Sequence, residues 1–102
     1  MHYYDYKNNE LYCEDVPLTQ IAAQAGTPFY VYSHAILQKR YNLFAEAFKG
    51  TDPLICFSLK SNASQAILKT FADMGAGLDI VSGGELYRGL KAGFVPAKIV
   101  YS

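Results

Sequence analysis

Lys60 and Asp79 are the residues of this sequence best placed to do chemistry. Lys60 ends an apolar run, LICFSLK, which predicts a strand over residues 54–60. Side chains alternate along a strand, so Lys60 shares one face with Cys56 and Ser58, and this face has little bulk. Asp79 lies in a second short run, LDIV, between apolar neighbours that point the other way. We therefore expect both side chains on low-bulk faces near strand ends.

A lysine beside a carboxylate suits an aldehyde cofactor. A neutral lysine amine condenses with an aldehyde to a Schiff base, and burial favours the neutral form by lowering the pKa of a lysine. Pyridoxal phosphate is the commonest such aldehyde and acts as an electron sink for carbanions. Asp79 can hydrogen-bond the lysine or the cofactor. Two plainer interpretations stay open: a solvated Lys60 that only marks the strand end, and an Asp79–Lys60 salt bridge that only orders it.

The three residues Ser82, Gly83 and Gly84 can add an anion site after the second run. They stand where a helix is expected to begin, and backbone N–H groups at a helix start can bind anions. The same residues also make a plain N-terminal cap, with Ser82 as the capping residue and Glu85 in the capping-box position. Glu85 is therefore first a capping residue and only second a site residue.

Strands and helices are expected to alternate around these residues. Asn62 and Gln65 have capping-box spacing, and the glycines at 75 and 77 end the helix that they begin. Such alternation predicts βαβ units, a parallel sheet and right-handed crossovers, which is an α/β fold. The expected elements are a strand at 54–60, a helix at 62–74, a strand at 78–81, a helix at 82–93 and a strand at 98–102. The apolar helix residues expected in the core are Ile67, Phe71, Met74, Leu86 and Leu90.

Among parallel architectures, the (β/α)8 barrel fits this pattern best. No Gly-x-Gly-x-x-Gly motif follows a strand and no P-loop occurs, so a dinucleotide or P-loop site is unsupported. Barrel sites lie at the C-terminal ends of strands, where Lys60 is expected. A barrel takes about 250 residues, and only about two βα units and a strand fit into this chain. We therefore expect the front portion of a larger protein.

The first part of the chain predicts a tyrosine-rich hairpin over residues 3–13. Its turn contains Asn8 and Asn9, which tolerate turn conformations. A short helix over 15–26 and a strand over 29–32 are expected next. Ser33 can then cap a helix whose apolar stripe predicts core contact. That stripe consists of Leu37, Tyr41, Phe44 and Phe48.

Composition restricts the partners. Lys plus Arg and Asp plus Glu both number nine, so nothing favours nucleic acid or an anionic membrane. No apolar run is long enough for a membrane span, and no signal peptide is present. The cysteines, Cys13 and Cys56, lack metal-ligand spacing and form no cluster with His2 or His34, so zinc is not expected. A reduced, cytoplasmic protein is the simplest interpretation.

Two segments resemble a known family. FSLKSN, at residues 57–62, is similar to the YAVKAN cofactor-lysine motif of the fold-type III pyridoxal phosphate-dependent decarboxylases. GAGLDIVSGGEL, at residues 75–86, is very similar to the GAGFDVVSGGEL motif of the diaminopimelate decarboxylase family. The hairpin and the segments 16–18, 26–33 and 92–94 also run in the family's order, so the resemblance covers essentially the whole chain. The first motif is shared with ornithine and arginine decarboxylases and, loosely, with alanine racemases.

The resemblance implies an alanine racemase-like (β/α)8 barrel. Residues 34–102 would be its first βα units, and residues 1–33 a β segment with a short helix that joins a C-terminal β-domain. It implies a carboxy-lyase that converts meso-2,6-diaminopimelate to L-lysine, the last step of lysine biosynthesis, in a cytoplasmic homodimer. Lys60 would carry the cofactor, pyridoxal 5'-phosphate, with Asp79 near it. The supporting residues would be Ser58, Ser82 and Glu85.

The sequence also departs from the family's pattern. Ser58 and Ser61 replace alanines of the first motif, and Leu59 replaces a valine. The family's phosphate loop, the acid that faces the pyridine nitrogen, the substrate arginines and the cysteine donated across the dimer all lie beyond Ser102. We therefore expect this chain alone to be inactive.

Three alternative readings stay open. The chain can belong to a related decarboxylase, acting on ornithine, arginine or carboxynorspermidine. It can also be a non-catalytic relative that binds pyridoxal phosphate or regulates a partner. A third reading is a shortened chain that self-associates through exposed apolar faces and strand edges.

Overall fold

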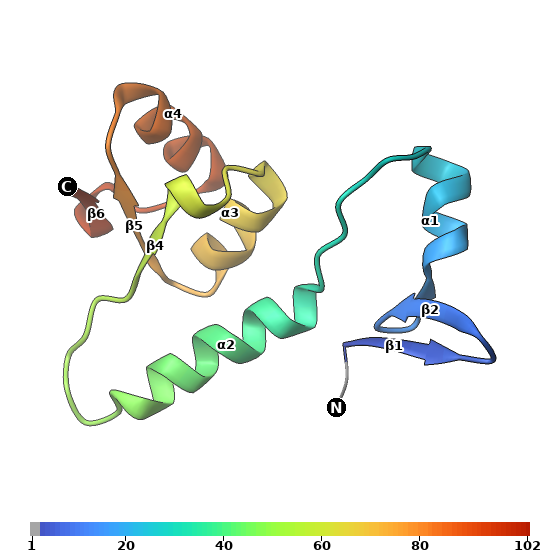
Figure 1. Cartoon of the computed structure of the whole chain (residues 1–102). Helices are drawn as coiled ribbons and strands as arrows, with labels where there is room; N and C mark the ends of the chain where they lie inside the picture. Colours follow the sequence, from blue (N-terminus) through green and yellow to red (C-terminus); the bar gives the residue numbers. More distant parts are fainter. Residues whose placement is uncertain (1–2) are drawn as a thin grey trace. The chain divides into compact units, whose positions relative to one another are not determined.

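A computed structural model describes residues 3–102 and divides the chain into two compact units (Figure 1). The N-terminal unit is Met1–Leu37 and the C-terminal unit is Gln38–Ser102. His2, one of the residues named in the expectation about zinc, lies outside the described residues. Among residues 3–102, no helix is long and apolar enough to cross a membrane.

The N-terminal unit begins with the predicted hairpin. Strands β1 (Tyr4–Lys7) and β2 (Glu10–Cys13) pair antiparallel, with Lys7 opposite Glu10. Asn8 and Asn9 make the turn at φ 54° and 64°, a left-handed backbone that asparagine adopts more readily than most residues. The hairpin prediction is confirmed. A third strand, β3 (Val16–Pro17), pairs with β2 and was not predicted.

Helix α1 (Leu18–Ala25) is shorter than predicted. The expected start at residue 15 is wrong, because Val16 and Pro17 are held in the sheet by β2. The expected end is confirmed, since Gly26 stops the helix at φ 78°, a conformation that glycine adopts without strain.

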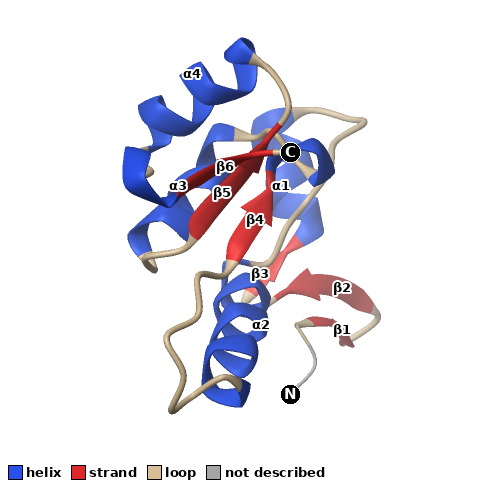
Figure 2. Cartoon of the chain, turned by 90° about the vertical axis from the view of Figure 1, so that its left-hand side faces the viewer, coloured by secondary structure: helices blue, strands red, loops and turns tan. Residues whose placement is uncertain are grey.

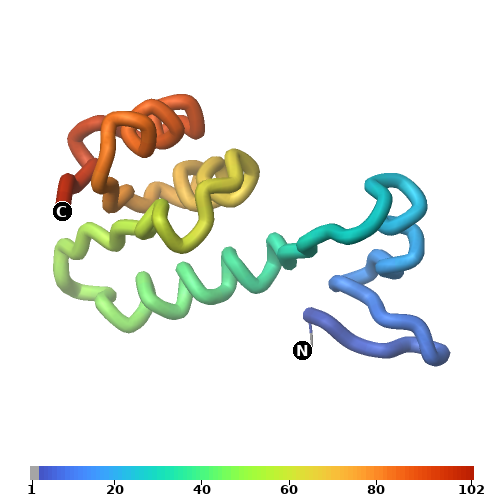
Figure 3. Tube along the Cα trace, turned by 45° about the horizontal axis from the view of Figure 1, so that its top comes forward, coloured from blue at the N-terminus to red at the C-terminus, as the bar shows by residue number. Residues whose placement is uncertain are grey.

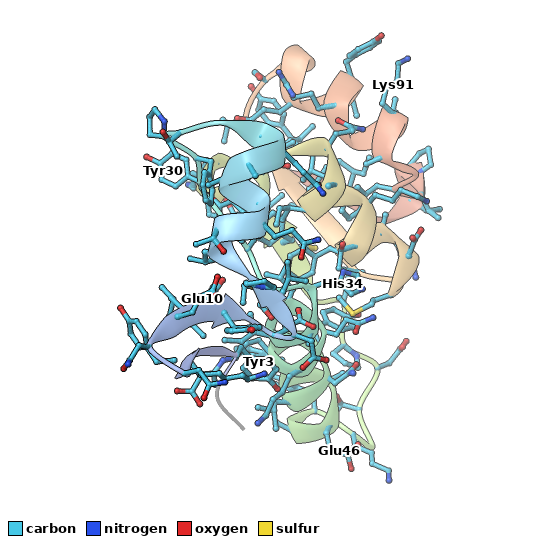
Figure 4. The ribbon with its side chains drawn as sticks, turned by 90° about the vertical axis from the view of Figure 1, so that its right-hand side faces the viewer. Tyr3, Glu10, Tyr30, His34, Glu46 and Lys91 are labelled. Atoms are coloured by element: carbon cyan, nitrogen blue, oxygen red, sulfur yellow. The ribbon has the colours of Figure 1, made fainter. Side chains whose placement is uncertain are left out.

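The predicted strand over residues 29–32 is wrong, because no ladder forms along this segment. One side chain holds the segment instead: the Tyr4 hydroxyl donates to Val31 O at 3.3 Å and accepts from Ser33 N at 3.0 Å. The Tyr30 side chain projects away from the backbone and is 90% exposed (Figure 4). A run of β-formers becomes a strand only when another strand takes up its backbone hydrogen bonds.

Helix α2 (His34–Ala47) starts where the sequence predicts and runs without a break (Figure 3). The buried Ser33 hydroxyl caps it by accepting from Ile36 N at 3.2 Å. Of its apolar stripe, Tyr41 packs edge-on against Phe71 in the C-terminal unit. The predicted core role of Phe44 and Phe48 is wrong: they stack on each other and are 60% and 46% exposed.

The C-terminal unit contains the predicted parallel sheet, with strand order β4-β5-β6 (Figure 2). Its strands are β4 (Cys56–Ser58), β5 (Gly77–Ile80) and β6 (Ile99–Tyr101). Helix α3 (Gln65–Asp73) connects the first pair, and helix α4 (Gly83–Ala92) connects the second. The predicted order of strand, helix, strand, helix, strand is confirmed.

The core of this unit lies between the sheet and its two helices. Leu78 fills it from β5 and inserts against Gly89 of α4, where a Cβ atom would lie 2.2 Å from the leucine Cδ2. The predicted core pair Leu86 and Leu90 is wrong, since these side chains are 37% and 46% exposed. The helix presents its smallest residues to the sheet because Leu78 already occupies the space. The predicted core residue Ile67 is buried. The buried residues that form one contiguous core cluster are Leu59, Leu68, Ala76, Leu78, Ile80, Ala92 and Phe94.

Helix α3 also begins differently from the prediction. Asn62 does not cap it; its Oδ1 accepts from Ser64 N at 2.9 Å and closes a local turn, so that the helix starts at Gln65. The Gln65 amide donates instead to Arg88 O of α4 at 3.3 Å. Leu68, which the sequence did not single out, is fully buried, whereas the expected core residue Met74 is the half-buried C-cap.

Candidate functional site

Lys60 lies directly beyond the carboxyl end of β4. The prediction placed Lys60 at the end of the strand itself, whereas the structure places it in the 3₁₀ turn Leu59–Ser61. Two hydrogen bonds close this turn: Asn62 N donates to Leu59 O at 3.1 Å, and Ser61 Oγ donates to Ser58 O at 2.7 Å. Leu59 is buried in the core and anchors the turn. Lys60 is therefore an exposed side chain on a well-fixed backbone.

The Lys60 amine is unengaged. Within residues 3–102 it has no hydrogen-bond or ion-pair partner, although its side chain is flanked by polar residues. The alternative of a salt bridge with Asp79 is not what the structure shows, because Asp79 Oδ1 accepts from Ser102 Oγ at 2.6 Å. An exposed amine without a partner is chemically accessible to an incoming aldehyde.

Asp79 lies on the face of β5 that points away from α3 and α4. Its neighbours Leu78 and Ile80 are buried in the core on the opposite face, as the alternation predicts. Asp79 is directly paired with Ser58 across the parallel β4–β5 ladder. The structure therefore brings together Ser58, the carboxylate of Asp79 and the turn that carries Lys60, at the carboxyl ends of two adjacent strands.

Ser58 is the unsatisfied group of this cluster. Its hydroxyl oxygen is buried and has no hydrogen-bond partner among residues 3–102. Phe57, the residue before it, points the other way, and its ring stacks on Phe71 with centroids 4.3 Å apart. A buried hydroxyl without a partner is uncommon in folded proteins and needs an explanation.

Cys56 shares this face and was not predicted as a site residue. A Cβ atom on Gly77, its partner in the ladder, would lie 2.8 Å from the Cys56 sulfur, so the thiol needs the glycine. Burial raises the pKa of the Cys56 thiol, and the negative charge of Asp79 raises it further. The alternation through Cys56, Ser58 and Lys60 was the signal in the sequence.

Ser82 and Glu85 fix the junction between β5 and α4. Ser82 Oγ accepts from Glu85 N at 3.1 Å, which confirms the predicted cap. The Glu85 carboxylate accepts from Val81 N at 2.8 Å rather than from the capping residue, so the reciprocal bond of the predicted capping box is shifted by one residue. Both side chains are occupied in holding the strand end against the helix.

An apolar hollow of about 260 Å³ in the same unit lies apart from Lys60. Among the groups that line it, Cys56 is shared with the polar face and Arg40 carries a charge. It offers no carboxylate or amine partner for chemistry, so the polar strand-end cluster is the better candidate site. The lining residues are Arg40, Tyr41, Phe44, Ile55, Cys56, Phe57, Phe71 and Ala76.

The comparisons with known proteins identify the family of the chain. A family model described as "Pyridoxal-dependent decarboxylase, pyridoxal binding domain" matches residues 34–102. The diaminopimelate decarboxylase of Haemophilus influenzae is 47% identical over 102 residues, which are 100% of this chain and 25% of that protein. The enzyme of the same name from Pseudomonas fluorescens is also 47% identical, over 100% of this chain and 24% of its own length.

Solved structures of similar proteins superimpose on this chain. A protein from Aquifex aeolicus superimposes with a TM-score of 0.91 at 44% identity, covering 97% of this chain and 24% of that chain. A diaminopimelate decarboxylase from M. jannaschii, in complex with L-lysine, superimposes with a TM-score of 0.90 at 33% identity, over 96% of this chain and 24% of that one. The chain spans about a quarter of the length of these relatives.

Proposed function

Because the chain belongs to the pyridoxal-dependent decarboxylase family, we propose that it carries the cofactor lysine of a diaminopimelate decarboxylase. The proposed reaction removes a carboxylate from meso-2,6-diaminopimelate and yields L-lysine. Relatives that bear this enzyme's name support it, as does the relative crystallised with L-lysine. The observation that carries the proposal is the free amine of Lys60 at the carboxyl end of a parallel strand.

The residues of the strand-end cluster fit a pyridoxal cofactor. They offer an unengaged amine, a carboxylate and a buried hydroxyl without a partner. When bound, pyridoxal phosphate supplies an electron sink for the carbanion that decarboxylation leaves. We assign Lys60 as the attachment point for the aldehyde and Asp79 as the charged group that hydrogen-bonds the cofactor or lysine.

The remaining residues have supporting roles in this proposal. The Ser102 hydroxyl holds the Asp79 carboxylate in place. Ser82 and Glu85 fix the turn after β5 and so keep the backbone of Asp79 at the strand end. Ser58 lies beside Asp79 in the ladder.

The proposed architecture is the front part of an alanine racemase-like (β/α)8 barrel, with a β segment before it. The parallel β4–β5–β6 sheet with intervening helices supports the barrel, and the family match starts at residue 34, just after the proposed boundary at residue 33. The whole enzyme is proposed to be a cytoplasmic homodimer. Since this chain spans about a quarter of its relatives' length, we propose that it does not turn over substrate by itself.

Cofactor capture tests the assignment of Lys60. The purified protein is incubated with pyridoxal phosphate, reduced with borohydride and mapped by mass spectrometry. We expect the label on Lys60, because its amine is free and the neighbouring backbone is fixed. Labelling spread evenly over the other lysines would contradict the assignment. Those lysines are Lys7, Lys39, Lys49, Lys69, Lys91 and Lys98.

A chimera tests the reaction. This chain replaces the matching quarter of the Haemophilus influenzae enzyme, to which it is 47% identical. We expect the chimera to release CO2 from meso-2,6-diaminopimelate, and the same chimera with Lys60→Ala to be inactive. Release from ornithine or arginine but not from diaminopimelate would assign the chain to another decarboxylase. A folded chimera that acts on none of them would refute the proposed reaction.

A further inference from the structure

Ser58 and Ser61 lie on either side of Lys60 in the sequence, and their hydroxyls differ in whether they make a hydrogen bond. Both stand where the cofactor-lysine motif of the resembling family has alanine. Ser61 is exposed, and its hydroxyl already donates to Ser58 O at 2.7 Å within the turn. The Ser58 hydroxyl is buried and has no partner. Ser61 is thus explained by local structure, whereas Ser58 is not.

The fold itself does not need the Ser58 hydroxyl. A buried polar group without a hydrogen bond destabilises the folded state, whereas an alanine of the same backbone shape has no such group to satisfy. The ladder between β4 and β5 is made by backbone atoms, and Phe57 and Leu59 supply the apolar contacts of this segment. A hydroxyl that weakens the empty protein is expected to find its partner in a bound molecule.

The position of Ser58 indicates which bound molecule would supply the partner of its hydroxyl. It lies two residues before Lys60 and beside Asp79, on the face of the sheet that is turned away from the core. The neighbouring hydroxyl, Ser102 Oγ, is already bonded to Asp79 Oδ1. A group attached to Lys60 would lie over this same face and can offer Ser58 an acceptor.

We propose that the Ser58 hydroxyl is a binding group for the pyridoxal cofactor held by Lys60, to which it donates a hydrogen bond. The inference rests on the proposed function, since it assumes that Lys60 carries the cofactor. Binding then supplies the partner that the hydroxyl lacks in the empty protein. The Ser58 hydroxyl thus lowers the stability of the cofactor-free protein and raises its affinity for the cofactor.

The test compares three variants by two measurements. The concentration of pyridoxal phosphate that half-saturates borohydride capture at Lys60 is measured for wild type, Ser58→Ala, Ser58→Thr and the matched control Ser61→Ala. Thermal unfolding of each cofactor-free protein is measured in parallel. We expect Ser58→Ala to raise the half-saturating concentration about threefold to tenfold, the effect of one hydrogen bond. The same variant should melt at a higher temperature than wild type when empty.

The other variants separate a binding role from a packing role. Ser58→Thr keeps the hydroxyl and should bind within about twofold of wild type, less than the effect of one hydrogen bond. Ser61→Ala should leave capture unchanged, because its hydroxyl is already used within the turn. Capture by Ser58→Ala equal to that of wild type would overturn the inference while leaving the proposed function intact. A wild-type protein that is not labelled at Lys60 would overturn both. A Ser58→Ala variant that melts lower than wild type, together with a Ser58→Thr variant that binds as weakly as Ser58→Ala, would overturn the inference and show a structural role only.

Discussion

The two strand-to-helix junctions of the C-terminal unit use their polar groups in opposite ways. After β5, the side chains of Ser82 and Glu85 each hold a backbone N–H, and the junction is closed. After β4, the Lys60 amine and the Ser58 hydroxyl are left without partners. The difference supports the proposal that the junction after β4 binds a ligand and the junction after β5 has a supporting role. Hydrogen-bond satisfaction, rather than residue type, separates the two roles.

Replacing Lys60 by arginine should have the largest effect of the substitutions that test this contrast. Arginine keeps the positive charge but has no amine that condenses with an aldehyde, so capture at this position should be lost completely. The free energy of unfolding should change by less than about 0.5 kcal/mol, because the amine has no partner to lose. Urea unfolding measures the second effect. Lys49→Arg is the matched control, and strong destabilisation by Lys60→Arg would mean that the amine is structurally engaged.

Replacing Gly89 by alanine tests the packing behind the closed junction. The new Cβ atom would lie 2.2 Å from Leu78 Cδ2, so either α4 or the leucine must shift. We expect destabilisation of about 1–3 kcal/mol by chemical denaturation. Gly83, in the first turn of the same helix, has nothing within 4 Å of a built Cβ. Gly83→Ala should therefore be neutral or stabilising, and equal effects of the two changes would contradict the proposed packing.

Replacing Ser82 by alanine tests the cap directly. Loss of the bond to Glu85 N leaves a helix donor without its partner and should destabilise the protein by about 1 kcal/mol. The sign is opposite to that expected for Ser58→Ala, whose hydroxyl has no partner to lose. Thermal melts of the two alanine variants, side by side, provide the comparison. Two shifts of the same sign would erase the distinction between the junctions.

The thiol of Cys56 reports the charge of Asp79 at the open junction. Burial raises the pKa of this thiol first, and the Asp79 carboxylate adds to the rise. Alkylation of Cys56 at pH 8 should therefore be slower in the folded than in the unfolded protein. Asp79→Asn removes the smaller of the two causes and should speed alkylation by less than about tenfold, the change that one pKa unit produces. Peptide mapping distinguishes Cys56 from Cys13, and an unchanged rate would show that Asp79 does not act on the thiol.

The hydrogen bonds that Glu14 accepts at the start of α2 should make the stability of the protein depend on acid. Ala35 N and the Ser33 hydroxyl donate to the Glu14 carboxylate at 3.1 and 2.8 Å, and these bonds lower the pKa of Glu14. The stability that they contribute is present above the unfolded-state pKa of a glutamate and is lost as pH falls through the lower folded-state value. Glu14→Gln should thus flatten the acid side of the stability profile slightly, as measured by melting temperature between pH 3 and 7. Parallel profiles for variant and wild type would contradict this.

The elements that could be predicted from the sequence are those with local causes. Asn8 and Asn9 define the hairpin turn because asparagine tolerates left-handed backbone. Ser33 and Ser82 start helices because a serine hydroxyl reaches the N–H three residues on. The alternation of apolar runs and helices gave the parallel sheet in the correct order. Each of these depends on residues within a few positions of one another.

The failures have non-local causes. The segment 29–32 has the composition of a strand but no neighbour that completes a ladder. Leu86 and Leu90 are apolar at helical spacing, yet α4 turns Gly89 toward the sheet because Leu78 fills that space. Neither outcome follows from periodicity, because each depends on which residues distant in sequence pack against the segment.

The sequence by itself determined the order of the elements in the C-terminal unit, the strand-end position of Lys60 and the face of Asp79, since side-chain alternation and capping act over a few residues. The tertiary structure decided which polar groups are engaged. It paired Asp79 with Ser102, and among the described residues it left the Lys60 amine and the Ser58 hydroxyl without a partner. Hydrogen-bond partners distant in sequence meet only when the sheet forms, so no spacing rule can tell a free polar group from an occupied one.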